Sequence, residues 1–241
     1  MEWFENWFDS KYYHVLYKNR DKKEATTLIN NLLNRFKFSK HSTFLDLACG
    51  TGRHSVYLNN KGFKVEGVDL SRKSLEKAKI YESKTLKFYC EDIRNFRKPK
   101  HYDVILNLFT SFGYFQNKSD NQKVFQNIHE SLKNKGLFIL DFFNTNKVIS
   151  NLKEHEIKII NNIRFEIKKK HDGDFVYKNI CVTDNENKHT FTEKVQLIRK
   201  DQFINYTTGL NMKLINSFGD YHFNNYDHQN SERLILVFQK D

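Results

Sequence analysis

The stretch that decides the fold reads Phe44-Leu45-Asp46-Leu47-Ala48-Cys49-Gly50-Thr51-Gly52-Arg53-His54-Ser55. Its pattern predicts a short apolar strand, then a tight glycine turn, then the first turn of a helix. Glycine tolerates positive φ and has no side chain that would keep a ligand away from the backbone. A helix that begins near Arg53 would point its free N–H groups toward such a ligand. The stretch therefore predicts a cradle for a nucleotide-like ligand.

Length and cysteine content restrict the class of protein. With 241 residues, the chain can form one domain with a sizeable core, or one domain and a small insertion. No apolar run is long enough to span a bilayer, and the acidic, aromatic N-terminus does not fit a secretory signal. Cys49, Cys90 and Cys181 are too few and too scattered for a disulfide framework or a zinc site. We therefore expect a cytoplasmic protein without a membrane partner.

The formal net charge of +11 suggests a nucleic-acid surface at first sight. The basic residues are dispersed along the chain, however, and their longest cluster is residues 168–170. Dispersed charge is typical of a solvated surface and not of a stripe that follows a phosphate backbone. A nucleic-acid partner is therefore kept as the alternative and not as the expected reading.

The first part of the chain predicts an aromatic helical leader, or cap, at 1–34, followed by alternating strands and helices. Strands are expected at 43–47, 63–69, 86–89, 102–108 and 137–142, and helices at 55–60, 72–81 and from about 120 to 132. Such alternation with near-continuous apolar strands predicts an α/β fold with a parallel sheet covered on both faces. Ligands of these sheets bind outside the carboxyl ends of the strands. The polar residues that each close a strand at that edge are Asp69, Asp92, Asn107 and Asp141.

The alternation of strands and helices ends after about Ile149. Antiparallel strands are expected at 154–163, 164–171, 175–184 and 190–199, with hairpin turns at 172–174 and 185–188. A helix at 201–210 and strands at 212–218 and 233–239 would complete the first sheet. The expected organisation is a leader at 1–34, a ligand-binding domain at 35–150 and 200–241, and an inserted antiparallel β subdomain at 151–199.

The glycine turn departs from the dinucleotide fingerprint. Ala48, Gly50 and Arg53 occupy the three glycine positions of G-x-G-x-x-G, so two of the three glycines are missing. An NAD-dependent oxidoreductase is therefore disfavoured. The pattern that is present is D-x-A-x-G-x-G, with Asp69 at the end of the next strand.

That pattern opens a series of four motifs that resemble those of the class I S-adenosylmethionine-dependent methyltransferases. Their order and spacing agree over about 40–145, and the motifs are 46–52, 68–71, 91–93 and 102–105 followed by Asn107. The resemblance implies a Rossmann-like, doubly wound seven-stranded sheet with an antiparallel last strand. It also implies S-adenosyl-L-methionine as cofactor, S-adenosyl-L-homocysteine as product, and methyltransferase activity (EC 2.1.1.-). The leader, the inserted β region and the tail at 218–221 and 231–235 resemble a bacterial small-molecule branch, whose insert covers the substrate pocket.

The resemblance also implies a set of cofactor contacts. In it, Gly50 and Gly52 let the main chain approach the methionine and ribose, and the Asp69 carboxylate accepts hydrogen bonds from the ribose hydroxyls. Asp92 or the Ile93 amide would read the adenine amino edge. The whole set is Ala48, Cys49, Gly50, Gly52, Arg53, Asp69, Leu70, Asp92, Ile93 and Asn107, with Tyr17 and Arg20 from the leader. The competing readings are a helix cap for Asp69 and a surface ion pair for Arg20.

The loop after residue 107 would face the transferred methyl group in this family. The substrate side is expected to hold Tyr13, Phe109, Ser111, Phe112 and Tyr114, and the π faces of the aromatic residues among them would attract a sulfonium. The loop lacks the D/N-P-P-Y/F signature of enzymes that methylate base amines or glutamine amides, and it lacks a Pro-Cys pair.

Methyl transfer needs a base only where the nucleophile must lose a proton, and positioning and water exclusion supply much of the rate. The candidates for a base are His14, Tyr114 and His222. No carboxylate/His cluster has ligand-like spacing near the fourth strand, so no metal is expected. We expect methyl transfer to an O, N or C nucleophile of a small molecule. The alternatives are an RNA (tRNA) methyltransferase and a non-catalytic S-adenosylmethionine-binding module.

Overall fold

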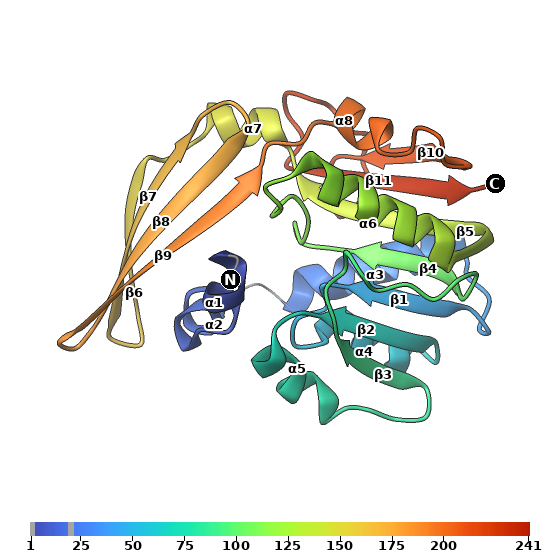
Figure 1. Ribbon diagram of the computed structural model, residues 1–241, viewed down its shortest axis with the longest axis horizontal. Coiled ribbons are helices and arrows are strands. Elements are labelled where there is room, and N and C mark those ends of the chain that lie inside the picture. Colours follow the sequence, from blue (N-terminus) through green and yellow to red (C-terminus); the bar gives the residue numbers. More distant parts are fainter. Residues whose placement is uncertain (1–2, 19–21) are drawn as a thin grey trace.

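The computed structural model describes residues 3–18 and 22–241, which form two β-sheets (Figure 1). The seven-stranded sheet has the order β10-β11-β5-β4-β1-β2-β3. Its strands are β1 Thr43–Leu47, β2 Lys64–Asp69, β3 Leu86–Cys90, β4 Tyr102–Asn107, β5 Leu132–Phe143, β10 Met212–Phe218 and β11 Arg233–Lys240. β11 is antiparallel to both of its neighbours, whereas the pairs among β1 to β5 are parallel. The expected doubly wound sheet with an antiparallel last strand is confirmed.

Helices cover both faces of this sheet, and each face has its own apolar core. On one face lie α3 Lys22–Phe36, α4 Arg53–Asn60 and α5 Arg72–Lys79, and on the other lie α6 Lys118–Ser131 and α8 Lys200–Asn205. Within β4, Val104 and Leu106 pack in the core on the α3 side, and Ile105 packs in the core on the α6 side. Strands buried on both faces need apolar side chains at successive positions, which explains their near-continuous apolar sequences.

The four-stranded sheet is antiparallel, with the order β6-β7-β8-β9. Its strands are β6 His155–Ile160, β7 Ile163–His171, β8 Phe175–Asp184 and β9 Asn187–Gln196, and α7 Thr145–Ser150 leads into them from β5. The last hairpin is tighter than expected. Asp184 pairs with Asn187, so a two-residue turn suffices, and β9 runs at 187–196 and not at 190–199.

The leader contains two short helices, α1 Trp3–Phe8 and α2 Lys11–Leu16. The Ser10 side chain caps α2 by accepting a hydrogen bond from the main-chain N–H of Tyr13 (3.0 Å). Both helices lie between the two sheets (Figure 1), and Trp7, Tyr12 and Leu16 join a core cluster with β7 and β8. Among the described residues, no helix combines the length and the apolarity that a membrane crossing needs.

Two expected boundaries in the seven-stranded domain are wrong. β5 begins at Leu132, where a helix end was expected, because the pairing of β4 with β5 contains a register shift that absorbs Lys135 at φ 62°. The helix expected at 201–210 ends at Asn205 and continues as turns, with Gly209 at φ 79°.

Candidate functional site

The glycine turn joins β1 to α4 through three residues with positive φ: Ala48 (58°), Gly50 (56°) and Gly52 (76°). The two glycines have different surroundings. A Cβ on Gly52 would lie 2.7 Å from Cζ of Phe88, so this position needs glycine for packing as well as for its φ. A Cβ on Gly50 would have no atom within 4 Å. Gly50 therefore exposes its backbone to open space in which a ligand can lie.

Asp69, at the end of β2, holds the turn in place. Its Oδ2 accepts the main-chain N–H of Gly50 (2.7 Å), and its Oδ1 accepts that of Ser71 (2.8 Å). Burial raises the pKa of the Asp69 carboxyl above its ordinary value. A carboxylate accepts about four hydrogen bonds, so two bonds to the backbone leave capacity for two ribose hydroxyls.

Three polar groups behind the turn are sealed from solvent. Asp46 accepts the Ser55 hydroxyl (2.6 Å), and burial raises its pKa to about 7. Burial lowers the pKa of His54 to about 3, so this imidazole is neutral at physiological pH. Burial also raises the pKa of the Cys49 thiol, so it is not a thiolate there.

Only some of the residues that are expected around the adenine ring can contact it in this conformation. Arg94 donates three hydrogen bonds of 2.6–3.1 Å from its guanidinium to the Asp92 carboxylate and also pairs with Asp120. This fork occupies the oxygens with which Asp92 would accept the adenine amino group. Ile93 packs against the core, and Leu70 is exposed at the strand ends. Ile93 and Leu70 therefore stay candidates for ring contacts, whereas Asp92 is a structural ion-pair partner in this conformation.

Asn107 ties the strand ends together. Its amide nitrogen donates to the carbonyls of Leu47 and Ser111 (3.1 Å each). Its Oδ1 is buried, and no described residue donates to it. An orphan acceptor at the end of β4, opposite the glycine turn, is suited to a donor on a bound ligand.

The loop after β4 contains two successive non-glycine residues in the left-handed region, Phe109 (φ 58°) and Thr110 (φ 62°). The fully buried Asp141 of β5 holds both. Its Oδ2 accepts the N–H of Phe109 (2.8 Å), and its carbonyl accepts that of Thr110 (2.9 Å). Arg233 of β11 donates from Nε to Asp141 Oδ1 (2.8 Å) and from Nη2 to the Thr110 hydroxyl (2.9 Å). Strained backbone of this kind persists only where its surroundings over-determine it.

These contacts place Phe109 between α4, the helix that follows the glycine turn, and the tail that contains Tyr221. The Arg53 guanidinium lies over its ring at 4.6 Å, and the rings of His54 and Tyr221 are centred 5.1 and 5.5 Å away. The Tyr221 hydroxyl donates to Asp141 (3.2 Å), and burial raises its pKa. The loop, the turn and the tail therefore form one connected wall.

A cavity of about 1180 Å³ adjoins this wall. It lies among the leader, the loop after β4, the four-stranded sheet and the tail. The predicted residues that line it are Tyr13, Tyr17, Phe109, Tyr114 and His222, and its other aromatic side chains include Trp3, Phe8, Phe143 and Tyr221. It does not reach Gly50, Asp69 or Asp92. The cavity therefore lies next to the glycine turn, with Phe109 in its wall, and not over the turn.

Some predicted residues lie elsewhere. Phe112 is buried in the core against Phe125, so it is not on the substrate side. The Ser111 hydroxyl donates to the Leu108 carbonyl and is likewise not part of the cavity lining. His14 lies on α2, away from the cavity lining, and burial lowers its pKa. Arg20 lies outside the described residues.

Tyr17, expected at the cofactor, lies on the cavity wall made by the four-stranded sheet. Its hydroxyl donates to Oε1 of Glu193 (2.6 Å) and contacts Nζ of Lys178. Trp7 Nε1 donates to the same Glu193 oxygen (2.7 Å). Neither Glu193 nor Arg233 was singled out as a site residue from sequence, because their partners are far along the chain. Only Asp141 gave a signal, as a polar residue expected to close an apolar strand.

Comparisons with known proteins agree with this geometry. Residues 44–136 match the family described as a methyltransferase domain. The chain is 34% identical over 107 residues to the putative methyltransferase YqeM of Bacillus subtilis. It is 31% identical over 130 residues to the malonyl-[acyl-carrier protein] O-methyltransferase of Bacillus anthracis. The matches cover 43% and 53% of this chain, and the chain spans 43% and 47% of those relatives.

The similarity of the structure is broader. A solved S-adenosylmethionine-dependent methyltransferase of Clostridium acetobutylicum superimposes with a TM-score of 0.79, over 95% of both chains and at 22% identity. The chain thus has the class I methyltransferase fold, and its match to the methyltransferase-domain family extends over residues 44–136.

Proposed function

We propose that the protein is an S-adenosylmethionine-dependent methyltransferase. The observation that carries this proposal is the open backbone face of Gly50, held by Asp69 and separated from an aromatic cavity by the Phe109 wall. A nucleoside-bearing cofactor against the turn and an acceptor in the cavity would meet at that wall. Ala48, Cys49, Gly52 and Arg53 build the turn and the helix start, and Asn107 Oδ1 is the acceptor for a cofactor donor group.

The acceptor is proposed to be a small molecule with an O, N or C nucleophile. The cavity volume is large enough to enclose such a molecule together with part of the cofactor. Its aromatic lining suits a sulfonium methyl donor, which transfers its methyl carbon to the nucleophile and leaves as a neutral thioether. Tyr114 and His222 line the cavity and stay candidates for a base, whereas His14 does not line it.

Calorimetric titration tests the cofactor assignment. S-adenosylmethionine should bind the wild-type protein, and NAD should not. Asp69→Ala should weaken binding of S-adenosylmethionine by about 1–3 kcal/mol, or roughly 5–150-fold, because charged hydrogen bonds are lost. Lys11→Ala, on an exposed ion pair of the leader, serves as the control. Absence of S-adenosylmethionine binding to the wild type would refute the proposal.

A turnover assay over a panel of small-molecule acceptors then separates catalysis from mere binding. The RNA alternative is tested with tRNA at increasing salt, since phosphate contacts weaken steeply as salt rises. A flat or absent response removes that alternative, and a steep one together with methyl incorporation into tRNA would replace the small-molecule reading.

A further inference from the structure

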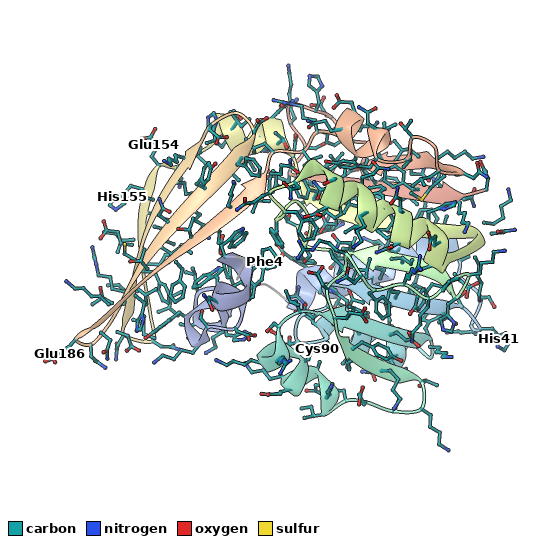
Figure 2. The ribbon with its side chains drawn as sticks, in the orientation of Figure 1. Phe4, His41, Cys90, Glu154, His155 and Glu186 are labelled. Carbon is teal, nitrogen blue, oxygen red and sulfur yellow. The ribbon has the colours of Figure 1, made fainter. Side chains whose placement is uncertain are left out.

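Within the described part of the chain, β6 is an edge strand that pairs only with β7, and it carries exposed apolar side chains. Ile157 is 47% exposed and Ile159 is 71% exposed. Their partners in β7 are Glu166 and Arg164, so both isoleucines lie on the face of the sheet opposite to the buried Phe165. In Figure 2 the neighbouring His155 projects from the outer side of this sheet, away from the seven-stranded sheet.

The main chain of β6 is open at the same positions. Lys169 N–H donates to the Glu154 carbonyl (2.8 Å), which makes this a hydrogen-bonded pair of the antiparallel ladder. Such pairs alternate with pairs that do not exchange hydrogen bonds. Residues 156 and 158 therefore also point their backbone groups at β7, whereas Ile157 and Ile159 point theirs outward.

β6 has only some of the usual protections of an edge. Edge strands are commonly blunted by charged side chains, above all lysine, by proline or by a bulge. β6 has the sequence HEIKII, with no proline and no register shift against β7, and its two charged residues, Glu156 and Lys158, have opposite signs. It is thus a regular strand with a free hydrogen-bonding edge.

We propose that β6 pairs antiparallel with β6 of a second copy of this chain, about a two-fold axis through Ile157. Ile157 then faces Ile157 of the partner subunit in a hydrogen-bonded pair. Glu156 faces Lys158 of the partner subunit, and Lys158 faces Glu156 of the partner subunit. Opposite charges at directly opposed positions stabilise such a ladder.

Charge selects this register over its neighbour. A shift that placed Ile157 opposite Ile159 of the partner subunit would preserve the outward hydrogen bonds. It would also put Lys158 opposite Lys158 of the partner subunit, and like charges directly opposed destabilise a sheet. The self-complementary contact closes with two-fold symmetry and gives a dimer and not a fibre. This pairing does not depend on methyl transfer.

Light scattering after size exclusion tests the oligomeric state. The wild-type chain should have twice its mass of 29.0 kDa. A monomer mass at micromolar concentrations would overturn the proposal. Glu156→Lys and Lys158→Glu should each raise the dimer dissociation constant by about tenfold, since symmetry doubles each change. The double variant should restore dimerisation, and failure to do so in a folded double variant would overturn the register.

Cysteine crosslinking tests the register with milder substitutions. In a background with Cys90→Ser and Cys181→Ser, which removes the two exposed thiols, Ile157→Cys should form an intersubunit disulfide. The hydrogen-bonded pair places those Cα atoms about 5.5 Å apart, within disulfide range. Ile159→Cys is the matched control, because its partner would be roughly 13 Å away along the strand. Crosslinking at 159 and not at 157 would refute the pairing.

Discussion

At the scale of single residues, the two glycines of the turn, Gly50 and Gly52, have different roles. Both have positive φ, but only Gly52 is closely packed, against Phe88. Gly52 is required by the fold, whereas Gly50 leaves open the space in which we propose that the cofactor binds. A sequence motif records both as glycine and does not tell them apart.

Alanine at each glycine should separate the two roles. Gly52→Ala should lower the free energy of unfolding by more than the ~1–2 kcal/mol that a left-handed backbone costs, because its Cβ also overlaps Phe88. Gly50→Ala should cost only the backbone part but should weaken S-adenosylmethionine binding. Urea denaturation and calorimetry measure the two quantities. Equal losses of stability in both variants would contradict this division.

Asp46 and His54 couple the turn to pH with opposite signs. The pKa of Asp46 is about 7 in the folded chain and 3.8 ordinarily, so folding takes up a proton between these values. Its contribution to stability is therefore lost as pH rises from about 4 to about 7. The pKa of His54 is about 3 when folded and 6.5 ordinarily, so its contribution increases with pH over nearly the same window.

Asp46→Asn should remove one of these opposing contributions. The free energy of unfolding of the variant, relative to wild type, should rise by up to about 1.4 kcal/mol per pH unit between about pH 4 and pH 7. It should then level off, because Asp46 is ionised in both states above that range. Asparagine can still accept the Ser55 hydroxyl, so packing is retained. Parallel stability curves for the two proteins across this range would refute the raised pKa.

At the scale of elements, the loop after β4 is shaped by strands that are distant in sequence. Asp141 on β5 and Arg233 on β11 hold the Phe109–Thr110 bend, and β11 reaches them only because it inserts beside β5. The loop is thus a property of the assembled sheet. Its own sequence, which is mostly aromatic, does not predict two left-handed residues in succession.

Asp141→Ala should release this bend. It leaves the Arg233 guanidinium partly buried without its carboxylate, and breaking such a pair costs about 3–5 kcal/mol. Hydrogen exchange at the amides of Phe109 and Thr110 should accelerate. The Phe109 amide loses its acceptor, the Asp141 carboxylate, and the Thr110 amide bonds to a main-chain carbonyl next to the released bend. Thr110→Val is the control, because it removes only the hydroxyl bond to Arg233. Unchanged exchange in Asp141→Ala would show that the bend is held by other contacts.

At the scale of the whole molecule, the leader joins the two sheets. Trp7 is fully buried against Phe191 of β9, and its indole N–H donates to Glu193 (2.7 Å). On the other side, the Ser71 hydroxyl donates to Asp9, beside the end of β2. The leader therefore contacts both the cavity wall and the strand ends, which is the position of a cover for the proposed site.

Trp7→Ala should detach this cover from the four-stranded sheet. Truncation of a buried tryptophan costs about 3–5 kcal/mol, and the leader should become sensitive to limited proteolysis. Lys11→Ala should leave protease sensitivity near that of wild type, since the Lys11–Asp184 pair is at the surface. If both variants resist protease equally, the leader is held by contacts other than Trp7.

The sequence by itself determined the seven-stranded fold and the turn, because both depend on local rules. Apolar runs, glycine spacing and an acid at the end of the next strand are encoded within about 30 residues, so the positions of Gly50, Gly52 and Asp69 at the turn follow from the sequence alone. Asn107 was likewise found, because a strand end is recognisable from the strand that precedes it.

Only the tertiary structure decided which residues line the cavity, that Arg94 pairs with the Asp92 carboxylate, and that one edge of β6 is open. Burial sends Phe112 into the core, and Arg94 occupies the Asp92 carboxylate. Asp141 and Arg233 meet across 92 positions of sequence. Such contacts depend on which strands become neighbours and on which side of a sheet meets solvent. Local propensity carries no information about either, since both follow from how the finished elements pack.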